Sequence, residues 1–326
     1  MAQFDARHVS ESALSVIDIS GLRSPDPAER RKVGDAMRHS CLDIGFMYIV
    51  GHGVPRERRD AVFAQAARFF SKPEDEKLAL HMKQSSGNNG YEPLRYQLLE
   101  PGTPPDLKEG FYIGEELPDD HPHLVTGKFN FGPNQWPDDL PEFRAAMMAY
   151  YDDMLGLGAL IMRGMALSLD LPEDYFEPFC TDPLTGLRLL HYPPQPPNPQ
   201  PGEKGCGAHT DFGGFTILMQ DDNGGLQVLG HDGEWIHATP IPDSYIVNLG
   251  DLMGRWTNDH YQSTVHRVVN VSGKERYSVP FFYSGNPDQD ITAIPTCVEA
   301  DDAPKYPSTT VDAHLREMYA KTYVPA

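Results

Sequence analysis

Basic residues are scarce in this sequence. Its 326 residues include 27 lysines and arginines against 47 aspartates and glutamates, which gives a formal net charge of −20 and a pI near 4.9. A protein that binds nucleic acid needs a basic stripe to neutralise phosphates. No such stripe is found here, so the charge argues against a nucleic-acid partner and is explained by solubility.

Long hydrophobic runs and clustered cysteines are also missing. No run approaches the roughly 18 apolar residues of a transmembrane helix, and the segment from Met1 to Ser20 lacks the basic-then-apolar pattern of a signal peptide. The four cysteines are scattered without metal-type spacing, which indicates free thiols in a reducing compartment. We therefore expect a cytoplasmic protein with no membrane partner, and the oligomeric state stays open.

The predicted elements indicate an α+β fold with a mainly helical region over about 1–180 and a strand-rich region over about 181–295. Short strands between turn signals are typical of a β-barrel or sandwich. No internal repeat is visible, so we expect one domain over 1–326. Helices are predicted over 28–41, 55–70, 73–80, 141–169 and 311–323, and strands over 15–19, 44–50, 186–192, 215–220, 226–229, 235–238, 245–248, 264–269 and 276–283.

The most informative stretch is Ala208-His209-Thr210-Asp211. Side chains alternate along a strand, so His209 and Asp211 are expected to point the same way, with Thr210 turned outward. A second imidazole comes from Val265-His266-Arg267 downstream. Two histidines and one carboxylate form the ligand set of non-haem Fe(II) oxygenases, which leaves positions open for substrate and dioxygen. The sequence therefore predicts His209, Asp211 and His266 as metal ligands and catalytic centre.

Three other histidines are weaker candidates for this centre. His52 lies in a Gly-His-Gly turn, and His260 lies in a turn that precedes the predicted ligand strand. By strand alternation, His191 faces away from whatever Tyr192 faces. We expect structural roles for all three.

Arg276-Tyr277-Ser278 is predicted to bind a carboxylate. Arg276 and Ser278 lie two apart on a strand, hence on one face, and a hairpin of 264–269 with 276–283 would return them to the metal strand. An arginine fork beside a hydroxyl is suited to a carboxylate. The alternative is a surface Arg-Ser pair.

Together with 212–218, 224–228 and 247–251, these motifs closely resemble the isopenicillin N synthase-like branch of the Fe(II)/2-oxoglutarate-dependent oxygenases. The resemblance runs from about Val16 to Tyr323 and includes Gly51-His52-Gly53-Val54-Pro55. It implies a double-stranded β-helix, or jelly roll, flanked by N-terminal helices and a C-terminal helix. It also implies Fe(II), 2-oxoglutarate and dioxygen, with decarboxylation of 2-oxoglutarate coupled to hydroxylation or another oxidation of a C–H bond in a small organic molecule.

The resemblance assigns roles to further residues. Arg276 and Ser278 would hold the distal carboxylate of 2-oxoglutarate, and Tyr192 of Tyr192-Pro193 would assist. The chain departs from many plant members at Leu190, where those carry an asparagine. This departure weakens the transfer of a plant-type substrate and leaves the metal and co-substrate assignments intact.

Two other functions compete with this one. Isopenicillin N synthase and aminocyclopropane carboxylate oxidase retain Arg-x-Ser without using 2-oxoglutarate, so a 2-oxoglutarate-independent Fe(II) oxidase is the first alternative. A non-enzymatic binding protein on a degenerate jelly roll is the second. Loss of a metal ligand would indicate the latter, and no ligand is lost.

The substrate is expected to contact the irregular segment 81–111, because the resemblance places the equivalent region on the substrate-facing wall. Arg95 is predicted to bind a substrate carboxylate, while Tyr91, Phe111 and Phe282 are candidates for an apolar wall. These residues suggest a small or medium-sized organic acid, such as an amino-acid derivative or a natural-product intermediate. The alternative is that Arg95 pairs with an acidic residue on the surface, Glu92 or Glu100.

Overall fold

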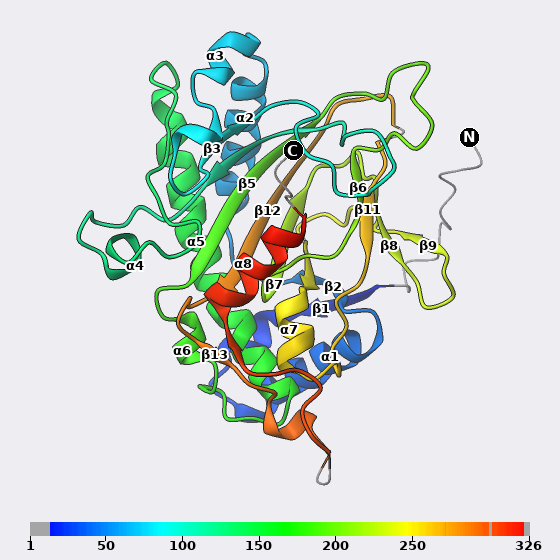
Figure 1. Cartoon of the computed structure of the whole chain (residues 1–326). Coiled ribbons are helices and arrows are strands. Elements are labelled where there is room, and N and C mark those ends of the chain that lie inside the picture. The colour runs from blue at the N-terminus through cyan, green and yellow to red at the C-terminus, as the bar shows by residue number, and fades with distance from the viewer. Residues whose placement is uncertain (1–13, 271, 300–301, 323–326) are drawn as a thin grey trace.

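Strands from both halves of the chain build one large sheet (Figure 1). The computed structural model describes residues 14–270, 272–299 and 302–322. The strand order is β1-β2-β10-β7-β12-β5-β4-β3, so a boundary near residue 180 would cut through the sheet. Its strands are β1 (Ser15–Asp18), β2 (Phe46–Val50), β3 (Gly90–Glu92), β4 (Glu109–Ile113), β5 (Leu184–Tyr192), β7 (Phe215–Gln220), β10 (Tyr245–Leu249) and β12 (Arg276–Gly285).

A smaller sheet in the order β6-β11-β8-β9 covers one face of the large sheet. Apolar side chains of both sheets form a common core, including Phe46 and Leu190 from the large sheet and Leu226 and Val268 from the small one. This is the predicted jelly-roll core. The remaining strands are β6 (Cys206–His209), β8 (Leu226–Leu229), β9 (Trp235–His237), β11 (His266–Val268) and the pair β13 (Asp290–Ile291) and β14 (Thr309–Thr310).

Helices α1 (Pro27–Asp43), α2 (Arg56–Phe70) and α5 (Pro141–Ser168) lie on the other face of the large sheet (Figure 1). Asp26 starts α1 by accepting a hydrogen bond from the backbone N–H of Ala28 at 2.9 Å. The shorter helices are α3 (Glu74–Leu78), α4 (Pro122–Val125), α6 (Glu177–Cys180), α7 (Asp251–Trp256) and α8 (Val311–Thr322), with 3-10 turns at Ile19–Arg23, Met82–Gln84 and Pro295–Cys297.

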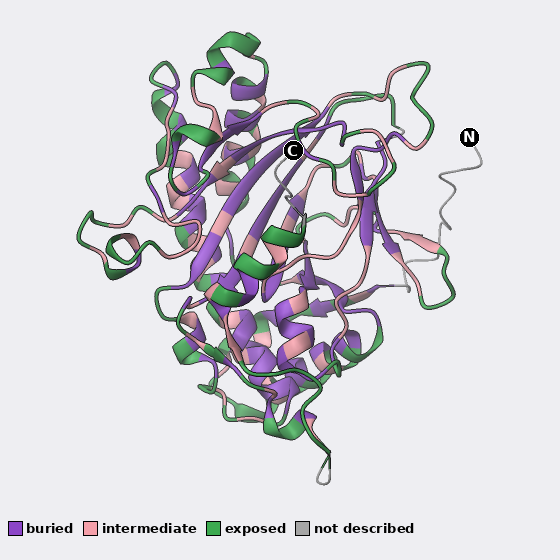
Figure 2. Cartoon of the chain, viewed as in Figure 1, coloured by how far each residue is buried: buried purple, intermediate pink, exposed green. Residues whose placement is uncertain are grey.

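The long helix α5 is buried along much of its length (Figure 2). Its methionines Met147, Met154 and Met165 are fully buried and fill the core. At Gly158 the helix passes so close to the large sheet that a Cβ atom would lie 2.4 Å from the ring of Tyr283. Glycine at this position therefore permits the close packing of α5 on β12.

The predicted hairpin of 264–269 with 276–283 is wrong. Strand β11 pairs with β6 and β8 in the small sheet, whereas β12 pairs with β5 and β7 in the large sheet. The intervening chain therefore crosses from one sheet to the other. Arg276 of β12 therefore faces His209 and His266 across the space between the two sheets.

Other differences concern element ends. The segment 81–111, predicted as irregular, contributes β3 and the start of β4. The predicted C-terminal helix ends in the structure at Thr322, and Tyr323 lies outside the described residues. In the part of the chain that is described, no helix combines the length and the apolar character that crossing a bilayer requires.

Candidate metal centre and adjoining cavities

His209, Asp211 and His266 converge where β6 ends and β11 begins. His209 ends β6 and pairs directly with His266 of β11, so the two rings lie 4.3 Å apart between centroids. Asp211 Oδ1 lies 3.8 Å from His209 Nε2 and 3.9 Å from His266 Nε2. Among the described residues, only these three form a cluster of three or more His, Cys, Asp or Glu side chains whose ligand atoms could hold one metal ion.

Neighbouring hydrogen bonds orient each of the three side chains. Nδ1 of His209 donates to the backbone oxygen of Gly207 at 2.8 Å, and Nδ1 of His266 donates to that of Thr264 at 3.1 Å. Both Nε2 atoms therefore keep a lone pair for a metal.

The Asp211 carboxylate is held from its other side. Its Oδ2 atom accepts from Thr216 Oγ1 at 2.5 Å and from Asn248 Nδ2 at 2.7 Å. These two bonds fix the carboxylate and leave Oδ1 directed toward the imidazoles. The three ligand atoms thus face one point.

The charges of the group suit a divalent cation. Burial lowers the pKa of both imidazoles, that of His266 to about 4, so both are neutral at pH 7. Burial opposes ionisation of Asp211, but His266, His209 and the two hydrogen bonds outweigh it and lower the pKa of that carboxyl. One negative charge and two neutral nitrogen ligands fit the 2-His-1-carboxylate set for Fe(II).

The sequence predicts that His209 and Asp211 share one strand and that Thr210 faces outward, and this prediction is only half right. His209 lies in β6, but Asp211 lies in the loop after it, so the loop places the carboxylate. Thr210 does not simply face outward. Its hydroxyl donates to Asp251 Oδ2 at 3.1 Å, and the residue lines a large cavity beside the triad.

A small cavity extends from the triad toward β12. Arg276 at its far end is fully buried, and its Nη1 donates to Ser278 Oγ at 3.1 Å. Nη2 donates to Gln220 Oε1 at 3.3 Å, and the guanidinium lies 4.8 Å from the ring centroid of Tyr192. Within the described ranges no carboxylate lies within ion-pair distance of Arg276, and its Nε has no hydrogen-bond partner. A buried cation without a counter-charge is suited to bind an anion.

The large cavity, of about 420 Å³, opens on the opposite side of the triad. Its wall includes many residues of the segment 82–99, as expected for the substrate-facing side, and residues of helix α8. Within this wall Arg188 forms a buried ion pair with Glu92 and donates to Gln97 Oε1 at 3.1 Å. Its guanidinium lies 4.4 Å from the ring centroid of Tyr112.

Of the four predicted substrate residues, Phe282 alone lines these two cavities, and it lines both. Arg95 is paired with Glu203, at 2.5 Å, rather than free for a ligand or paired with Glu92 or Glu100. Tyr91 donates to Glu109 Oε2 at 2.6 Å, and Phe111 is packed in the helix-side core. The binding roles predicted for these three are therefore not supported by their positions.

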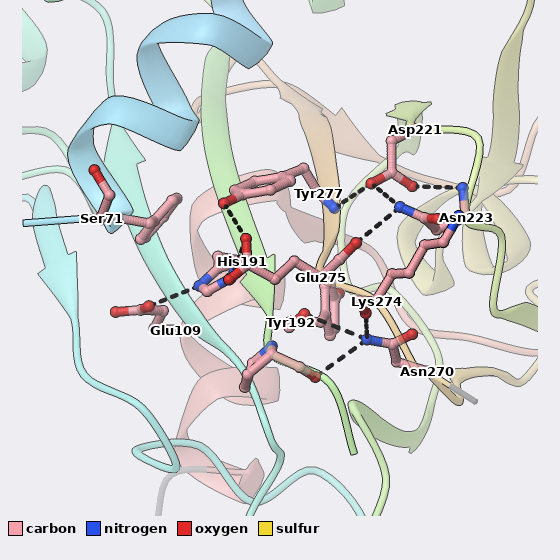
Figure 3. Close-up of polar contacts among 12 residues, drawn as sticks. Ser71, Glu109, His191, Tyr192, Asp221, Asn223, Asn270, Lys274, Glu275 and Tyr277 are labelled. Atoms are coloured by element: carbon pink, nitrogen blue, oxygen red, sulfur yellow. Dashed lines mark hydrogen bonds and ion pairs between the residues drawn. The ribbon is translucent and has the colours of Figure 1, made fainter. Parts of the chain in front are cut away.

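The competing histidines lie away from the triad. His191 Nδ1 lies 2.8 Å from Glu109 Oε1, and its ring stacks on Tyr277, on the face opposite Tyr192 (Figure 3). His52 accepts from the backbone of Val54, and His260 is exposed. All three positions agree with the predicted structural roles.

Sequence reasoning missed the residues that support or line the centre. Thr216, Asn248 and Arg188 were not singled out, although Asn248 stands in the motif Val-Asn-Leu-Gly-Asp. A polar residue inside an otherwise apolar strand was the signal for Asn248. Arg188 lies between Leu187 and Leu189 on a predicted strand, so its side chain points to the opposite face of the sheet from theirs. A charged residue at that position indicated that this second face is not purely apolar.

Comparisons with known proteins agree with this geometry. Residues 14–139 match a family model described as the N-terminal region of a non-haem dioxygenase in morphine synthesis, and residues 184–285 match that of the 2OG-Fe(II) oxygenase superfamily. The chain is 45% identical to a 2-oxoglutarate-Fe(II) type oxidoreductase of Emericella nidulans, over 97% of this chain and 92% of the relative. It is 37% identical to clavatol oxidase of Penicillium crustosum, over 95% of this chain and 96% of the relative.

Solved structures give the same result. A full-length Neurospora crassa protein in complex with alpha-KG and thymine is 33% identical, with a TM-score of 0.83, over 97% of this chain and 99% of that one. A putative 2OG-Fe(II) oxygenase family protein of Caulobacter crescentus is 31% identical, with a TM-score of 0.84, over 95% and 99% of the two chains.

Proposed function

Because this chain belongs to the 2OG-Fe(II) oxygenase superfamily, we propose that residues 1–326 form one oxygenase domain in which His209, Asp211 and His266 hold the iron. The protein is an Fe(II)/2-oxoglutarate-dependent dioxygenase that couples decarboxylation of 2-oxoglutarate to oxidation of a C–H bond in a small molecule. The observation that carries the residue assignment is the convergence of Asp211 Oδ1 and two imidazole Nε2 atoms on one point.

When bound, Fe(II) supplies the site at which 2-oxoglutarate and dioxygen react. The chain's own residues prepare that site. Thr216 and Asn248 hold the carboxylate of Asp211, and mostly buried residues line the small cavity beside it. Arg276, Ser278 and Tyr192 lie at the end of the small cavity, where they are suited to bind the distal carboxylate of 2-oxoglutarate.

Replacing Thr216 by valine is expected to weaken metal binding without unfolding the protein. Valine has nearly the shape of threonine but cannot donate to Asp211 Oδ2, so the carboxylate is free to rotate. We expect the dissociation constant of Mn(II), used as a redox-stable probe, to rise by about 10–100-fold. Calorimetric titration measures this, and Thr185→Val, at another buried threonine of the large sheet, is the matched control. Equal metal affinity in both variants would remove Thr216 from the site.

For the substrate we propose a small planar ring compound whose polar edge both donates and accepts hydrogen bonds. The pair Arg188–Glu92 supplies donors and an acceptor together, and it is neutral overall because the arginine brings its own carboxylate. Aromatic side chains supply flat walls around it: Tyr96, Tyr112, Phe129, Phe212, Phe282 and Tyr319. The similar Neurospora crassa protein was solved with thymine and with 5-formyluracil, both of which are planar rings.

A metabolite screen tests this substrate class. The purified enzyme with Fe(II) is offered neutral heterocycles, phenols and small carboxylic acids, and the succinate formed above the substrate-free level is measured. We expect the ring compounds to stimulate succinate formation with matching loss of the compound. Stimulation by acyclic carboxylic acids alone would favour the organic acid predicted from the sequence.

Replacing Arg188 by lysine is expected to impair substrate binding selectively. Lysine keeps the charge opposite Glu92 but loses the planar fork and its stacking on Tyr112. With the compound found in the screen, we expect KM to rise by about tenfold or more, while substrate-free decarboxylation of 2-oxoglutarate persists. Arg95→Lys, outside both cavities, is the matched control. A large effect at Arg95 and none at Arg188 would reverse the assignment.

A further inference from the structure

Lys108 places a buried ammonium group at the small cavity, and neither the metal triad nor the carboxylate clamp uses it. The residue immediately precedes β4 and is only 2% exposed. It lines the cavity together with Tyr192, Arg276 and the triad. Lysine is almost never fully buried without a specific partner or role.

The strand register explains how this ammonium reaches the cavity. Gly110 of β4 pairs with Leu190 of β5, and Tyr192 of β5 pairs with Arg276 of β12. Lys108 precedes Gly110 by two residues and therefore continues the same face. Lys108, Tyr192 and Arg276 thus form a row across three strands, directed at the space between the sheets.

Two of the three donors of the ammonium have partners in the chain. Nζ forms an ion pair with Asp106 and donates to Cys206 Sγ at 3.4 Å. Burial disfavours the charged form, but Cys206 and Asp106 outweigh it, and the pKa of Lys108 is raised. An ammonium has three N–H donors, so one remains for a ligand in the cavity.

Cys206 links Lys108 to the metal triad. Cys206 Sγ, which contacts the Lys108 ammonium, also lies 3.9 Å from His209 Nδ1. Leu190, which faces the same cavity, offers no hydrogen-bond donor. Lys108 is therefore a charged donor that precedes β4 and lines the small cavity together with the triad.

We propose that Lys108 binds the 2-oxo-acid end of 2-oxoglutarate, as a second cation beside Arg276. This inference rests on the proposed function of the site. A 2-oxo acid held at the metal would keep at least one carboxylate oxygen that the metal does not bind. In a buried cavity such an oxygen needs a donor, and a charged N–H donor gives the stronger bond.

The test compares two variants that differ only in the ammonium group. Asp106→Asn keeps Lys108 and removes its counter-charge, whereas the double variant Asp106→Asn with Lys108→Met leaves a neutral pair of similar shape. Anaerobic calorimetry measures binding of 2-oxoglutarate to each protein loaded with Mn(II), so no turnover is needed. We expect the dissociation constant in the double variant to be at least about tenfold above that of Asp106→Asn, with Mn(II) affinity in the absence of 2-oxoglutarate changed by less than about twofold.

Equal 2-oxoglutarate affinity in the two folded variants would overturn the proposal and leave Lys108 a structural role. If the double variant melts early, Asp106→Asn with Lys108→Gln replaces it, because glutamine retains an N–H donor. At least about threefold weaker binding is then expected, and an unchanged affinity overturns the proposal. If the unaltered Mn(II)-loaded protein fails to bind 2-oxoglutarate, the proposed function itself fails, which separates the two outcomes.

Discussion

Replacing Asp211 by alanine is expected to abolish substrate-dependent succinate formation. Asp211 supplies the only carboxylate of the triad, and its removal leaves two neutral imidazoles facing a divalent cation. Loss of a residue that merely supports a ligand costs about 10–100-fold in metal affinity or activity, so loss of the ligand itself is expected to cost more than about 100-fold. Succinate formation and Mn(II) titration measure the two effects. His209→Ala and His266→Ala are expected to behave alike.

Asp211→Glu gives a sharper version of this test. The carboxylate and its charge are kept, but the longer side chain displaces the oxygen, and such sites tolerate roughly 0.5 Å. It also misplaces the oxygen that accepts from Thr216 and Asn248. Activity of Asp211→Glu is therefore expected to be poor. His231→Ala, at an exposed histidine, is the control that should remain active. Full activity in any triad variant would refute the metal assignment.

The triad and the clamp were accessible to sequence analysis because their chemistry depends on short spacings. His209 and Asp211 are two residues apart, as are Arg276 and Ser278, so each pair stays together in any extended backbone. His266 required more than spacing, because its cross-strand pairing with His209 joins distant segments. Its surrounding motifs identified it through the resemblance to the oxygenases.

Contacts between distant segments were not accessible in the same way. Arg95 and Arg188 are both arginines near predicted pocket elements, yet Glu203 pairs with one and Glu92 with the other. Which acidic side chain forms an ion pair with which arginine depends on the order of strands in the sheet, and the local sequence around each residue does not encode that order. The wrong hairpin has the same origin, because local turn signals do not indicate a crossing between sheets.

The comparisons decide between the two oxygenase functions that the sequence left open. Arg-x-Ser alone fits both a 2-oxoglutarate-dependent enzyme and an oxidase that lacks this co-substrate. The similar Emericella nidulans protein is named as a 2-oxoglutarate-Fe(II) type oxidoreductase, and the similar Neurospora crassa structure contains alpha-KG. An intact triad beside an uncompensated buried arginine also argues against a degenerate binding protein.

Replacing Arg276 by lysine is expected to weaken 2-oxoglutarate binding far more than metal binding. The guanidinium is fully buried, donates to Ser278 and Gln220, and has no carboxylate partner among the described residues, so a ligand carboxylate would supply its counter-charge. Lysine retains the positive charge but cannot form the planar two-point contact. A hydrogen bond to a charged group contributes about 1.5–3 kcal/mol, which corresponds to a dissociation constant raised between about tenfold and about 150-fold.

Anaerobic calorimetry on the Mn(II)-loaded protein measures this effect, and Arg267→Lys is the matched control. Arg267 is also buried, stacks on Trp235 at 3.9 Å and donates to Gln227, but it lines neither cavity. Its substitution is expected to lower the melting temperature without changing 2-oxoglutarate affinity. Ser278→Ala and Tyr192→Phe should each weaken binding in the same direction as Arg276→Lys, but less, because each removes one neutral hydroxyl. If Arg276→Lys binds 2-oxoglutarate as tightly as the unaltered protein, Arg276 is not the clamp, and the anion must be bound elsewhere in the small cavity.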